Sequence, residues 1–481
     1  MGDSVSSLVD LTTVELVAMI KGKEVSSYEV VSAFIKQIET HNPSINAIVS
    51  FQPEYALSEA RKADKRFAKG NVDGPLHGIP MAFKDTHDAR GFKTTKGCTV
   101  LQDNVAKEDE LLVSRLRRAG AIGIGKTNVP EFAAGSHTFN PVFGLTRNPY
   151  NLEKSAGGSS GGAAAALAAR MIPLADGSDM GGSCRNPAAF NNVVGLRPSP
   201  GRVPTYPKAN GFGTISVQGP LAKTVNDVAL AMSVISGYDK RVPIAIREEG
   251  HMFLQRLEHD FKKMKVAYSE DLGGLLALDE PVRKAFKNQL AVWESLGCEL
   301  VDVAPDLAEA AEVFETLRAF EMEAAGGAFV EQHRAELKTT YVKNVEKGMN
   351  LTGPEVGRAL RKQTELVHEM ARFFSNYDFL MLPTTQVEPF DANVEYPTMI
   401  AGEAMKSYTS WMQSCSLISV LNTPAISVPG GFTENGLPFG LQLVAPIGQD
   451  FELLQMAHAY ESVTKHYQKQ PKMNVEESKP L

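Results

Sequence analysis

The sequence has little cysteine and no long apolar run. Its four cysteines, Cys98, Cys184, Cys298 and Cys415, are widely spaced and form no Cys-x-x-Cys pair. They therefore predict neither a disulfide framework nor a zinc site, and they favour the reducing cytoplasm. No apolar stretch approaches the roughly 18 residues of a membrane-spanning helix, and no basic-then-apolar signal segment begins the chain. None of the ten histidines stands at metal-ligand spacing from another, so we expect no metal and no cofactor.

The charge balance also excludes some partners. The 49 basic and 56 acidic side chains give a net charge of −7, which disfavours nucleic-acid binding by phosphate neutralisation. The segment Met1–Ser6 fits the loose template for N-myristoylation. No polybasic patch follows to supply a second membrane signal, so we expect no membrane partner. With 481 residues, 43% of them hydrophobic, the chain can bury a large core as about three domains or one large α/β domain.

The first half of the chain predicts α/β layering. Thr12-x-x-Glu15 and Ser26-x-x-Glu29 are capping boxes for two helices, the second ending at Pro43. These helices fit either a cover for the core or the contact of a homodimer. From 74 to 200, apolar strands alternate with Gly-rich turns and helices, with strands expected at 79–83 and 121–124 and helices at 111–118 and 161–171. That order predicts a mostly parallel sheet covered by helices.

The second half changes character. Strands are expected at 265–268, 299–303, 379–382, 425–428 and 439–444, and Asn435-Gly436 predicts a hairpin between the last two. Helices are expected at 281–296, 308–333 and 356–374, the last two as a helical elaboration that walls a pocket. We therefore divide the chain into N-terminal helices (1–70), a catalytic core (71–240), a pocket wall (241–400), C-terminal core strands and helix (401–467) and a loose polar tail (468–481).

Two glycine-flanked serine clusters are the most unusual feature of the sequence. They are Gly157-Gly158-Ser159-Ser160-Gly161-Gly162 and Gly177-Ser178-Asp179-Met180-Gly181-Gly182-Ser183. Glycine gathers where the backbone must approach another group closely or take a positive φ. Exposed backbone N–H groups beside hydroxyls supply a nucleophile and an oxyanion site, which acyl transfer requires. A flexible linker is the alternative, but the apolar runs around the clusters disfavour it.

Two other motifs compete for the same chemistry. Gly157-Gly158-Ser159-Ser160-Gly161 matches the G-x-S-x-G nucleophile elbow of an esterase-like α/β-hydrolase. That motif needs a preceding strand, where we expect a turn-rich loop at 148–154, and a downstream histidine such as His458. Residues 120–127 match the P-loop pattern G-x-x-x-x-G-K-T. Here the expected strand lies inside the motif, and Pro130 falls where the phosphate-binding helix should run.

Taken together, the motifs identify a family. Gly78-Ile79-Pro80-x-x-x-Lys84-Asp85, the two Gly/Ser clusters, and Arg185-x-Pro187-Ala188 resemble the amidase signature family of serine hydrolases. Lys84, Ser159 and Ser183 are separated by 75 and 24 residues, as in that family. The resemblance continues through Gly195–Pro198, Gly219–Leu221 and Pro424–Pro429. It implies a large α/β/α sandwich around a twisted, mostly parallel mixed sheet, with a helical elaboration beside the active site.

The resemblance also assigns roles to residues. It implies Ser183 as nucleophile, Ser159 after a cis peptide bond as bridging serine, and Lys84 as base. Backbone N–H groups of Met180, Gly181, Gly182 and Ser183 would form the oxyanion hole, and Ser160, Asp179 and Arg185 would support the loops. A solvated lysine has a pKa of about 10.4 and is charged at neutral pH. We therefore expect burial to lower the pKa of Lys84 by roughly three units.

The implied activity is hydrolysis of a small or aryl-bearing linear amide, or of a carbamate or ester, with water as co-substrate. The alternative is the glutaminase subunit of a tRNA-dependent amidotransferase. Where that subunit's acidic substrate contact would fall, this chain has Trp411-Met412-Gln413-Ser414. A catalytically inactive interaction protein is a third reading, which the intact Lys84, Ser159 and Ser183 argue against. We interpret Cys184 as a small buried neighbour, and Trp411 and Phe139 as candidates for either the acyl pocket or the packed interior.

Overall fold

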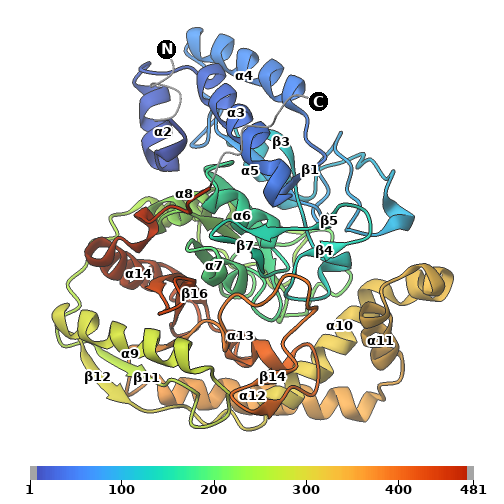
Figure 1. Cartoon of the computed structure of the whole chain (residues 1–481), viewed down its shortest axis with the longest axis vertical. Coiled ribbons are helices and arrows are strands. Elements are labelled where there is room, and N and C mark those ends of the chain that lie inside the picture. Colours follow the sequence, from blue (N-terminus) through green and yellow to red (C-terminus); the bar gives the residue numbers. More distant parts are fainter. Residues whose placement is uncertain (1–7, 474–481) are drawn as a thin grey trace.

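A computed structural model describes residues 8–473, and one mixed sheet of 11 strands runs through it (Figure 1). The strand order is β1-β3-β2-β8-β10-β9-β16-β17-β13-β11-β12. The strands are β1 (Ile48–Val49), β2 (Pro80–Lys84), β3 (Ile122–Thr127), β8 (Leu174–Asp179), β9 (Val194–Arg197), β10 (Val217–Ala222), β11 (Lys265–Tyr268), β12 (Glu299–Asp302), β13 (Phe379–Pro383), β16 (Ala425–Phe432) and β17 (Pro438–Val444). The strands predicted at 265–268, 379–382 and 439–444 are confirmed within one residue.

Parallel pairing occupies two blocks of this sheet. Strands β3, β2 and β8 are parallel to one another, as are β13, β11 and β12. The strands between these blocks pair antiparallel. The expected hairpin at Asn435-Gly436 is part of the reason, because a short turn joins β16 directly to β17 and can only produce an antiparallel pair. The α/β class and the mixed sheet are confirmed, with the parallel ladders on the two flanks.

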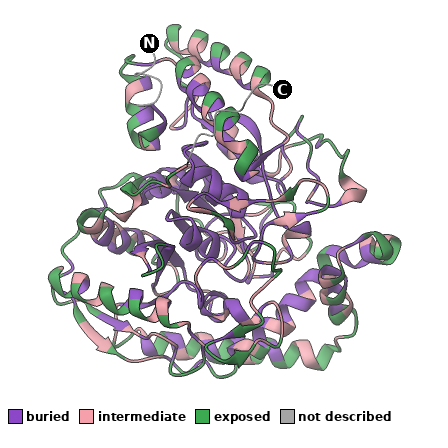
Figure 2. Cartoon of the chain, in the orientation of Figure 1, coloured by how far each residue is buried: buried purple, intermediate pink, exposed green. Residues whose placement is uncertain are grey.

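Helices cover both faces of the sheet. The alternating side chains of its strands show this, because they belong to different hydrophobic clusters. In β13, Phe379 and Met381 belong to one hydrophobic cluster, whereas Leu380 and Leu382 belong to another. Because successive strand residues point to opposite faces, the two clusters lie on opposite sides of the sheet. Figure 2 shows the buried interior around the central strands and α6, with exposed residues on the outer helices. The molecule therefore has three layers, helix, sheet and helix.

Each layer of helices can be assigned from its buried residues. The first cluster takes side chains from α2 (Thr13–Lys21), α5 (Leu111–Arg118), α8 (Val225–Ile235), α9 (Glu280–Ser295) and α14 (Asp450–Thr464). The opposite face is covered by α4 (Pro53–Ala68), α6 (Gly161–Ala168), α7 (Arg185–Phe190), α10 (Ala310–His333), α12 (Gly353–Phe373) and α13 (Gln413–Ser419). Short strand pairs β4–β5 (Phe139–Asn140, Gly144–Leu145), β6–β7 (Arg147–Asn148, Asn151–Ser155) and β14–β15 (Met399–Ile400, Glu403–Ala404) lie outside the main sheet.

The N-terminal helices begin where the capping boxes predict. Thr12 and Ser26 each accept a hydrogen bond from the backbone of the glutamate three residues later, and each glutamate bonds back. The second helix, α3 (Ser27–Ile45), differs from the prediction at its end, since Pro43 lies inside it. The chain instead leaves the helix at Asn46, whose φ of 57° is left-handed. Whether this face contacts a second copy stays a prediction, and the Met1–Ser6 template and most of the polar tail lie outside the described residues.

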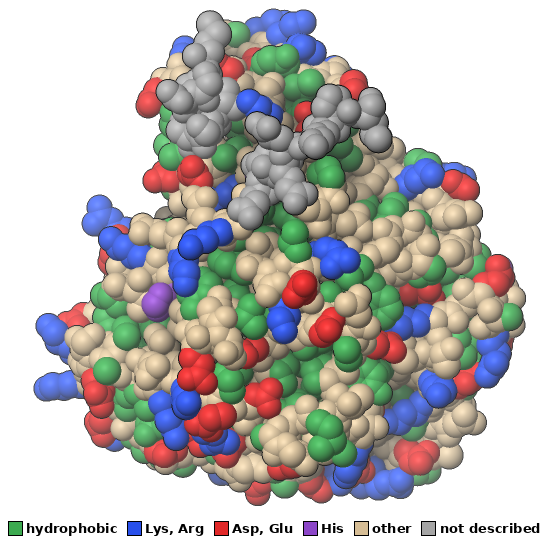
Figure 3. Space-filling view, in the orientation of Figure 1, with side chains coloured by type: hydrophobic (Ala, Val, Ile, Leu, Met, Phe, Trp, Pro, Cys, Tyr) green, Lys and Arg blue, Asp and Glu red, His purple; other side chains and the backbone are tan. Residues whose placement is uncertain are grey.

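The expected helical elaboration is present on the side opposite the N-terminal helices (Figure 1). Helix α10 (Ala310–His333) is followed by α11 (Thr339–Met349) and α12 (Gly353–Phe373). The expected helices 308–333 and 356–374 are thus confirmed within three residues, whereas α11 was not predicted. Acidic and basic side chains are interspersed on the face seen in Figure 3. Across residues 8–473, no helix has the length and apolar character that crossing a membrane would require.

Candidate active site

Lys84 is the last residue of β2, and its side chain is fully buried. Met81 and Phe83 of this strand pack into one face of the sheet and Ala82 into the other, so alternation places Lys84 on the face of Ala82, which α6 covers. Its Nζ donates to three hydroxyls at the end of the strand: Ser159 Oγ at 2.8 Å, Ser160 Oγ at 2.9 Å and Ser178 Oγ at 2.9 Å. The two Gly/Ser clusters, distant in sequence, therefore meet on one amine.

The surroundings of Lys84 disfavour a charged amine. Burial lowers its pKa from 10.5 to about 8, although the charges of Asp176 and Asp179 act in the opposite direction. Among residues 8–473 no carboxylate lies within ion-pair distance of the Nζ atom. Asp176 instead accepts a hydrogen bond from the Lys84 backbone N–H, at 3.2 Å, and bonds His87 Nδ1 at 2.5 Å. A buried lysine without a paired anion is suited to hold and release a proton near neutral pH.

Ser159 is positioned by a tightly packed glycine segment. The peptide bond between Gly158 and Ser159 is cis, as the resemblance implied. Directly afterwards α6 begins at Gly161 and packs against the chain around Asn128. A Cβ on Gly162 would lie 2.3 Å from the Asn128 backbone nitrogen, so only glycine fits there. The glycines at the start of α6 therefore serve close packing, and the flexible-linker alternative does not hold.

Ser183 lies in the loop after β8 and faces a cavity of about 150 Å³. Ser159 and Ser178 line the same cavity, so the three hydroxyls share one space with the tip of the loop. Ser183 is 8% exposed, and its hydroxyl has no hydrogen-bond partner within the described part of the chain. A hydroxyl at the wall of a cavity with a free hydrogen-bonding capacity can attack a bound carbonyl carbon.

The loop between Asp179 and Ser183 holds the four backbone N–H groups that we expected to form an oxyanion hole. The Gly182 N–H donates to Asp179 Oδ1 at 2.9 Å, so it is already used in this structure. The N–H groups of Met180, Gly181 and Ser183 have no acceptor among residues 8–473. Met180 and Gly181 also line the cavity. Free backbone donors beside the hydroxyl provide what an oxyanion site requires.

A buried ion cluster holds this loop. Arg185 donates to both oxygens of Asp179, at 3.0 and 2.9 Å, and Arg197 lies 3.4 Å from the same carboxylate. Burial would raise the pKa of Asp179, but the two guanidinium groups outweigh it and hold that pKa well below its usual range. Asp179 also accepts from the backbone N–H of Cys184, whose thiol pKa burial raises. The loop is thus pinned on both sides of Ser183, and Cys184 is a buried neutral neighbour, as we interpreted it.

The remaining cavity wall comes from helices and loops that carry no recognised motif. Its side chains include Phe132, Arg318, Met322, Tyr408 and Met412. Neither Trp411 nor Phe139 lines it: Trp411 stacks on Phe190, and Phe139 lies under Lys338. Trp411 belongs to the packed interior, whereas Phe139 is only half-buried. Ser178 and Arg318 were missed by sequence reasoning; Ser178 lies in the second Gly/Ser cluster, and Arg318 stands four residues from both Phe314 and Met322, at the spacing of an apolar helix face.

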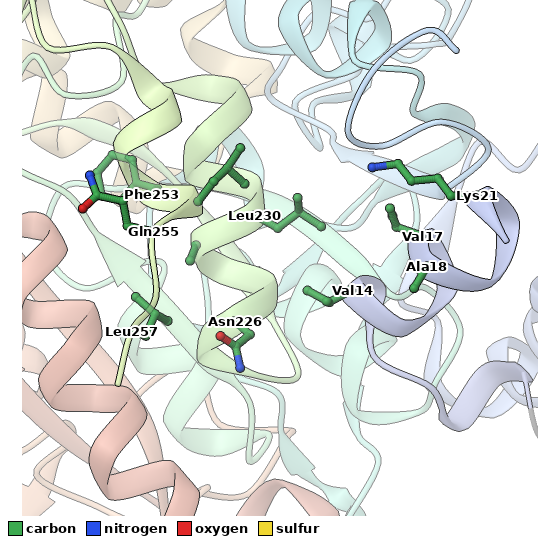
Figure 4. A pocket seen from close by; sticks show the side chains of 11 residues that line it. Val14, Val17, Ala18, Lys21, Asn226, Leu230, Phe253, Gln255 and Leu257 are labelled. Atoms are coloured by element: carbon green, nitrogen blue, oxygen red, sulfur yellow. The ribbon is translucent and has the colours of Figure 1, made fainter. Parts of the chain in front are cut away.

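A larger hollow elsewhere lacks reactive groups. It measures about 380 Å³ and lies between α2, α8 and the turn around Phe253 (Figure 4). Val14, Val17, Leu230 and Leu257 give it a mainly apolar lining, and Lys21 is its one titratable residue among those described. No residue of its described lining is a serine or a cysteine. The smaller cavity at Ser183 is therefore the better candidate for chemistry.

The competing motifs do not acquire the structural context they need. Residues 122–127 of the P-loop pattern form strand β3, and Lys126 donates to the His87 carbonyl and to Thr94 Oγ1. A short strand, β7, does precede Ser159, which corrects our expectation of a loop at 148–154, but it pairs with β6 and bridges to Asp391 rather than joining the main sheet. His458 lies in α14 and is not among the described residues of the cavity wall.

Known proteins resemble this chain over nearly its whole length. The family model described as Amidase matches residues 29–454. An acylamidase of Rhodococcus erythropolis is 34% identical over 96% of this chain and 97% of its own. A glutamyl-tRNA(Gln) amidotransferase subunit of Thermosynechococcus vestitus is 33% identical over 95% of this chain and 99% of its own. Among solved structures, a bacterial aryl acylamidase of the amidase signature family superposes with a TM-score of 0.88 at 28% identity, covering 98% of this chain and 99% of that one.

Proposed function

The chain belongs to the amidase signature family of amide-hydrolysing enzymes, and from that premise we propose that it cleaves a small or aryl-bearing linear amide through an acyl-enzyme on Ser183. The observation that carries the proposal is the buried Lys84 amine, 2.8 Å from Ser159 Oγ and in the same site as Ser183. The small cavity supports a small substrate. The similarity to proteins named acylamidase and aryl acylamidase supports an amide with an acyl or aryl group.

The proposed reaction transfers two protons in a relay through three groups. Neutral Lys84 accepts the proton of Ser159 while Ser159 accepts that of Ser183, whose oxygen attacks the substrate carbonyl carbon. The tetrahedral oxyanion is held by backbone N–H groups of Met180, Gly181 and Ser183. Ser159 then donates its proton to the leaving amine as the carbon–nitrogen bond breaks, and Lys84 returns a proton to Ser159, because the Ser183 oxygen is now bonded to the acyl carbon. Water repeats the attack on the ester and releases the acid.

A substrate panel tests this proposal. Purified wild type and Ser183→Ala are compared on p-nitroanilides, aryl amides and carbamates, with product release followed over time. Turnover by wild type that Ser183→Ala abolishes supports the assignment. Turnover that survives in Ser183→Ala would transfer the nucleophile to another residue. The ranking of substrates distinguishes amide from carbamate or ester specificity.

A second candidate is the glutaminase subunit of a tRNA-dependent amidotransferase. The observation that favours it is the 33% identity to an amidotransferase chain of this kind over nearly its whole length. Against it, Met412 lies in the run where we would place that subunit's acidic substrate contact, but it is apolar and lines the cavity. Glutaminase activity of the purified chain, or further subunits that copurify with it at constant ratio, would support this candidate. Amidase activity of the isolated chain with no glutaminase activity would reject it.

A further inference from the structure

Arg318 places a buried positive charge in the cavity that contains the serine hydroxyls. It lies in the middle of α10, is 6% exposed, and lines the cavity together with Ser159 and Ser183. The proposed amidase chemistry does not use it. A charged side chain in so small a site needs a separate explanation.

The hydrogen bonds of Arg318 leave most of its donors free. One terminal nitrogen donates to Asn344 Oδ1 and the other to the Tyr408 hydroxyl, both neutral groups. The guanidinium carbon lies 5.1 Å from the centre of the Tyr408 ring. A guanidinium has five N–H donors in a planar fork. The other three have no acceptor among residues 8–473, whereas Asn344 and Tyr408 hold the group in place.

Several other buried arginines are paired with carboxylates, whereas Arg170, which is 8% exposed and lies outside this cavity, also has no carboxylate at ion-pair distance among the described residues. Arg185 binds Asp179 at 2.9 Å, and Arg202 binds Asp450 at 3.0 Å. Within the described chain no carboxylate lies at ion-pair distance from Arg318. On its own helix, Glu315 and Glu321 each stand three residues away: Glu315 binds Lys347 at 3.0 Å and accepts from Thr409, and Glu321 accepts from Asn210 at 2.9 Å. A buried charge without an opposite partner is costly, and a bound anion removes that cost.

We propose that Arg318 binds a carboxylate of the substrate, so that the enzyme acts on a small amide bearing an anionic group. The inference rests on the proposed function, because it requires a substrate whose amide carbonyl is attacked by Ser183 while a carboxylate at its other end binds Arg318. The planar fork suits bidentate binding of a carboxylate. A cavity of about 150 Å³ holds roughly one benzene ring. Only a few atoms therefore separate the carboxylate from the amide.

The same cavity disfavours a substrate with an added ammonium group. Its lining contains no aspartate or glutamate among the described residues. The α-ammonium of free glutamine would meet Arg318 and Lys84 without a paired anion. The amide favoured here therefore has a carboxylate and no amine of its own, such as the monoamide of a short dicarboxylic acid.

The test compares charged amides with neutral amides of the same shape. Malonamate, succinamate and glutaramate are each paired with a neutral amide in which an isopropyl group replaces the carboxylate. For succinamate this neutral partner is 4-methylpentanamide. Wild type, Arg318→Met and Arg318→Lys are assayed for kcat/KM on every pair. Arg361→Met, which removes an exposed positive charge on α12, is the control for net charge. Labelling of Ser183 by a neutral fluorophosphonate reports whether each variant is folded and reactive.

Wild type should cleave at least one charged amide faster than its neutral partner. Removing one partner of a buried charge pair costs roughly 2–5 kcal/mol, so Arg318→Met should lose about 30-fold or more on that amide. It should keep its rate on the neutral partner and its labelling. Arg318→Lys should fall between the two, because lysine keeps the charge and loses the fork. Arg361→Met should match wild type throughout.

The inference is overturned if wild type prefers the neutral amide of every pair or cleaves no charged amide. It is also overturned if Arg318→Met labels normally but its kcat/KM falls equally on the charged and the neutral amide of a pair. If Arg318→Met does not label at Ser183, Arg318→Lys becomes the deciding variant. The inference is then overturned if Arg318→Lys labels and has the same kcat/KM values, and the same preference for the charged amide, as wild type. Failure of the proposed function looks different. In that case wild type itself does not label at Ser183 and cleaves neither member of any pair.

Discussion

The Nζ atom of Lys84 lies 2.8 Å from the Oγ atom of Ser159, in a place where the lysine side chain is fully buried. Its other hydrogen-bond partners are the hydroxyls of Ser160 and Ser178. Hydroxyls can either donate to a neutral amine or accept from a charged one. The pair can therefore exchange a proton without leaving an unpaired charge in the interior.

Replacing Lys84 should remove most of the activity. We expect Lys84→Ala to lower kcat/KM on an amide substrate by about 100- to 10,000-fold, because a positioned general base contributes that much. Steady-state kinetics on the best substrate of the panel measures it. Lys107→Ala, on the exposed surface, is the matched control. A loss of less than tenfold in Lys84→Ala would contradict the role of Lys84 as base.

The pH profile should report the lowered pKa of Lys84. The base must be neutral, so kcat/KM should fall tenfold per pH unit below a pH of about 8 and level off above it. Rates on a non-titrating amide between pH 5.5 and 9.5 measure the profile. A plateau that extends down to pH 6 would contradict a lysine base with this pKa.

The same shift predicts how stability depends on pH. Because the folded-state pKa is lowered from 10.5 to about 8, the unfolded chain binds more protons between these values, and stability should rise with pH across that window. The contribution of Lys84 amounts to about 3 kcal/mol. Urea unfolding of wild type and Lys84→Met at pH 7.5 and 10 isolates it as a difference. Equal pH dependence in the two proteins would show that burial does not perturb this amine.

Gly182 should be irreplaceable for two separate reasons. Its φ is +115°, and a Cβ there would lie 2.6 Å from both Asn186 Nδ2 and Cys415 Cβ. We expect Gly182→Ala to destabilise the fold by about 1–3 kcal/mol from backbone strain, with the clash in addition, and to slow catalysis by displacing the loop. Gly436→Ala is the control, since Gly436 also has a positive φ of +74° and has nothing within 4 Å. Equal effects of the two variants on urea unfolding would argue against the close contact.

The Asp179–Arg185 pair should matter more for stability than an exposed pair of the same chemistry. Arg185→Met leaves a buried carboxylate short of its partner, which costs about 3–5 kcal/mol. Arg372→Met removes an ion pair to Glu369 whose arginine is 69% exposed, and should cost at most about 1 kcal/mol. Chemical denaturation of both variants makes the comparison. Similar losses would contradict a network that pins the Ser183 loop.

Sequence alone predicted the residues that carry local signals. The capping boxes of α2 and α3, the Asn435-Gly436 hairpin and the buried strand that ends at Lys84 follow from short-range rules, and the structure has them all. The resemblance named Lys84, Ser159 and Ser183, and the structure brings Lys84 and Ser159 into hydrogen-bond contact and places Ser183 at the same cavity. The catalytic roles of these residues stay a proposal.

The residues that sequence missed are those whose meaning depends on long-range packing. Arg318 lies in a 24-residue helix, four residues from both Phe314 and Met322, so helical spacing places it on the buried face but does not show what it contacts there. Its burial follows from α11 and from the loop that carries Tyr408, which pack against α10 from later parts of the chain. The end of α3 was also misjudged, since the helix continues past Pro43 and ends at Asn46.

Fluorophosphonate labelling followed by peptide mass spectrometry is the most direct measurement. The account predicts a single adduct on Ser183, absent from Ser183→Ala, and formed in wild type at a rate that rises with pH toward a plateau above about 8. In Lys84→Ala the adduct should form at least about 100-fold more slowly. An adduct on Ser159, or labelling of Ser183 at an unchanged rate without Lys84, would contradict it.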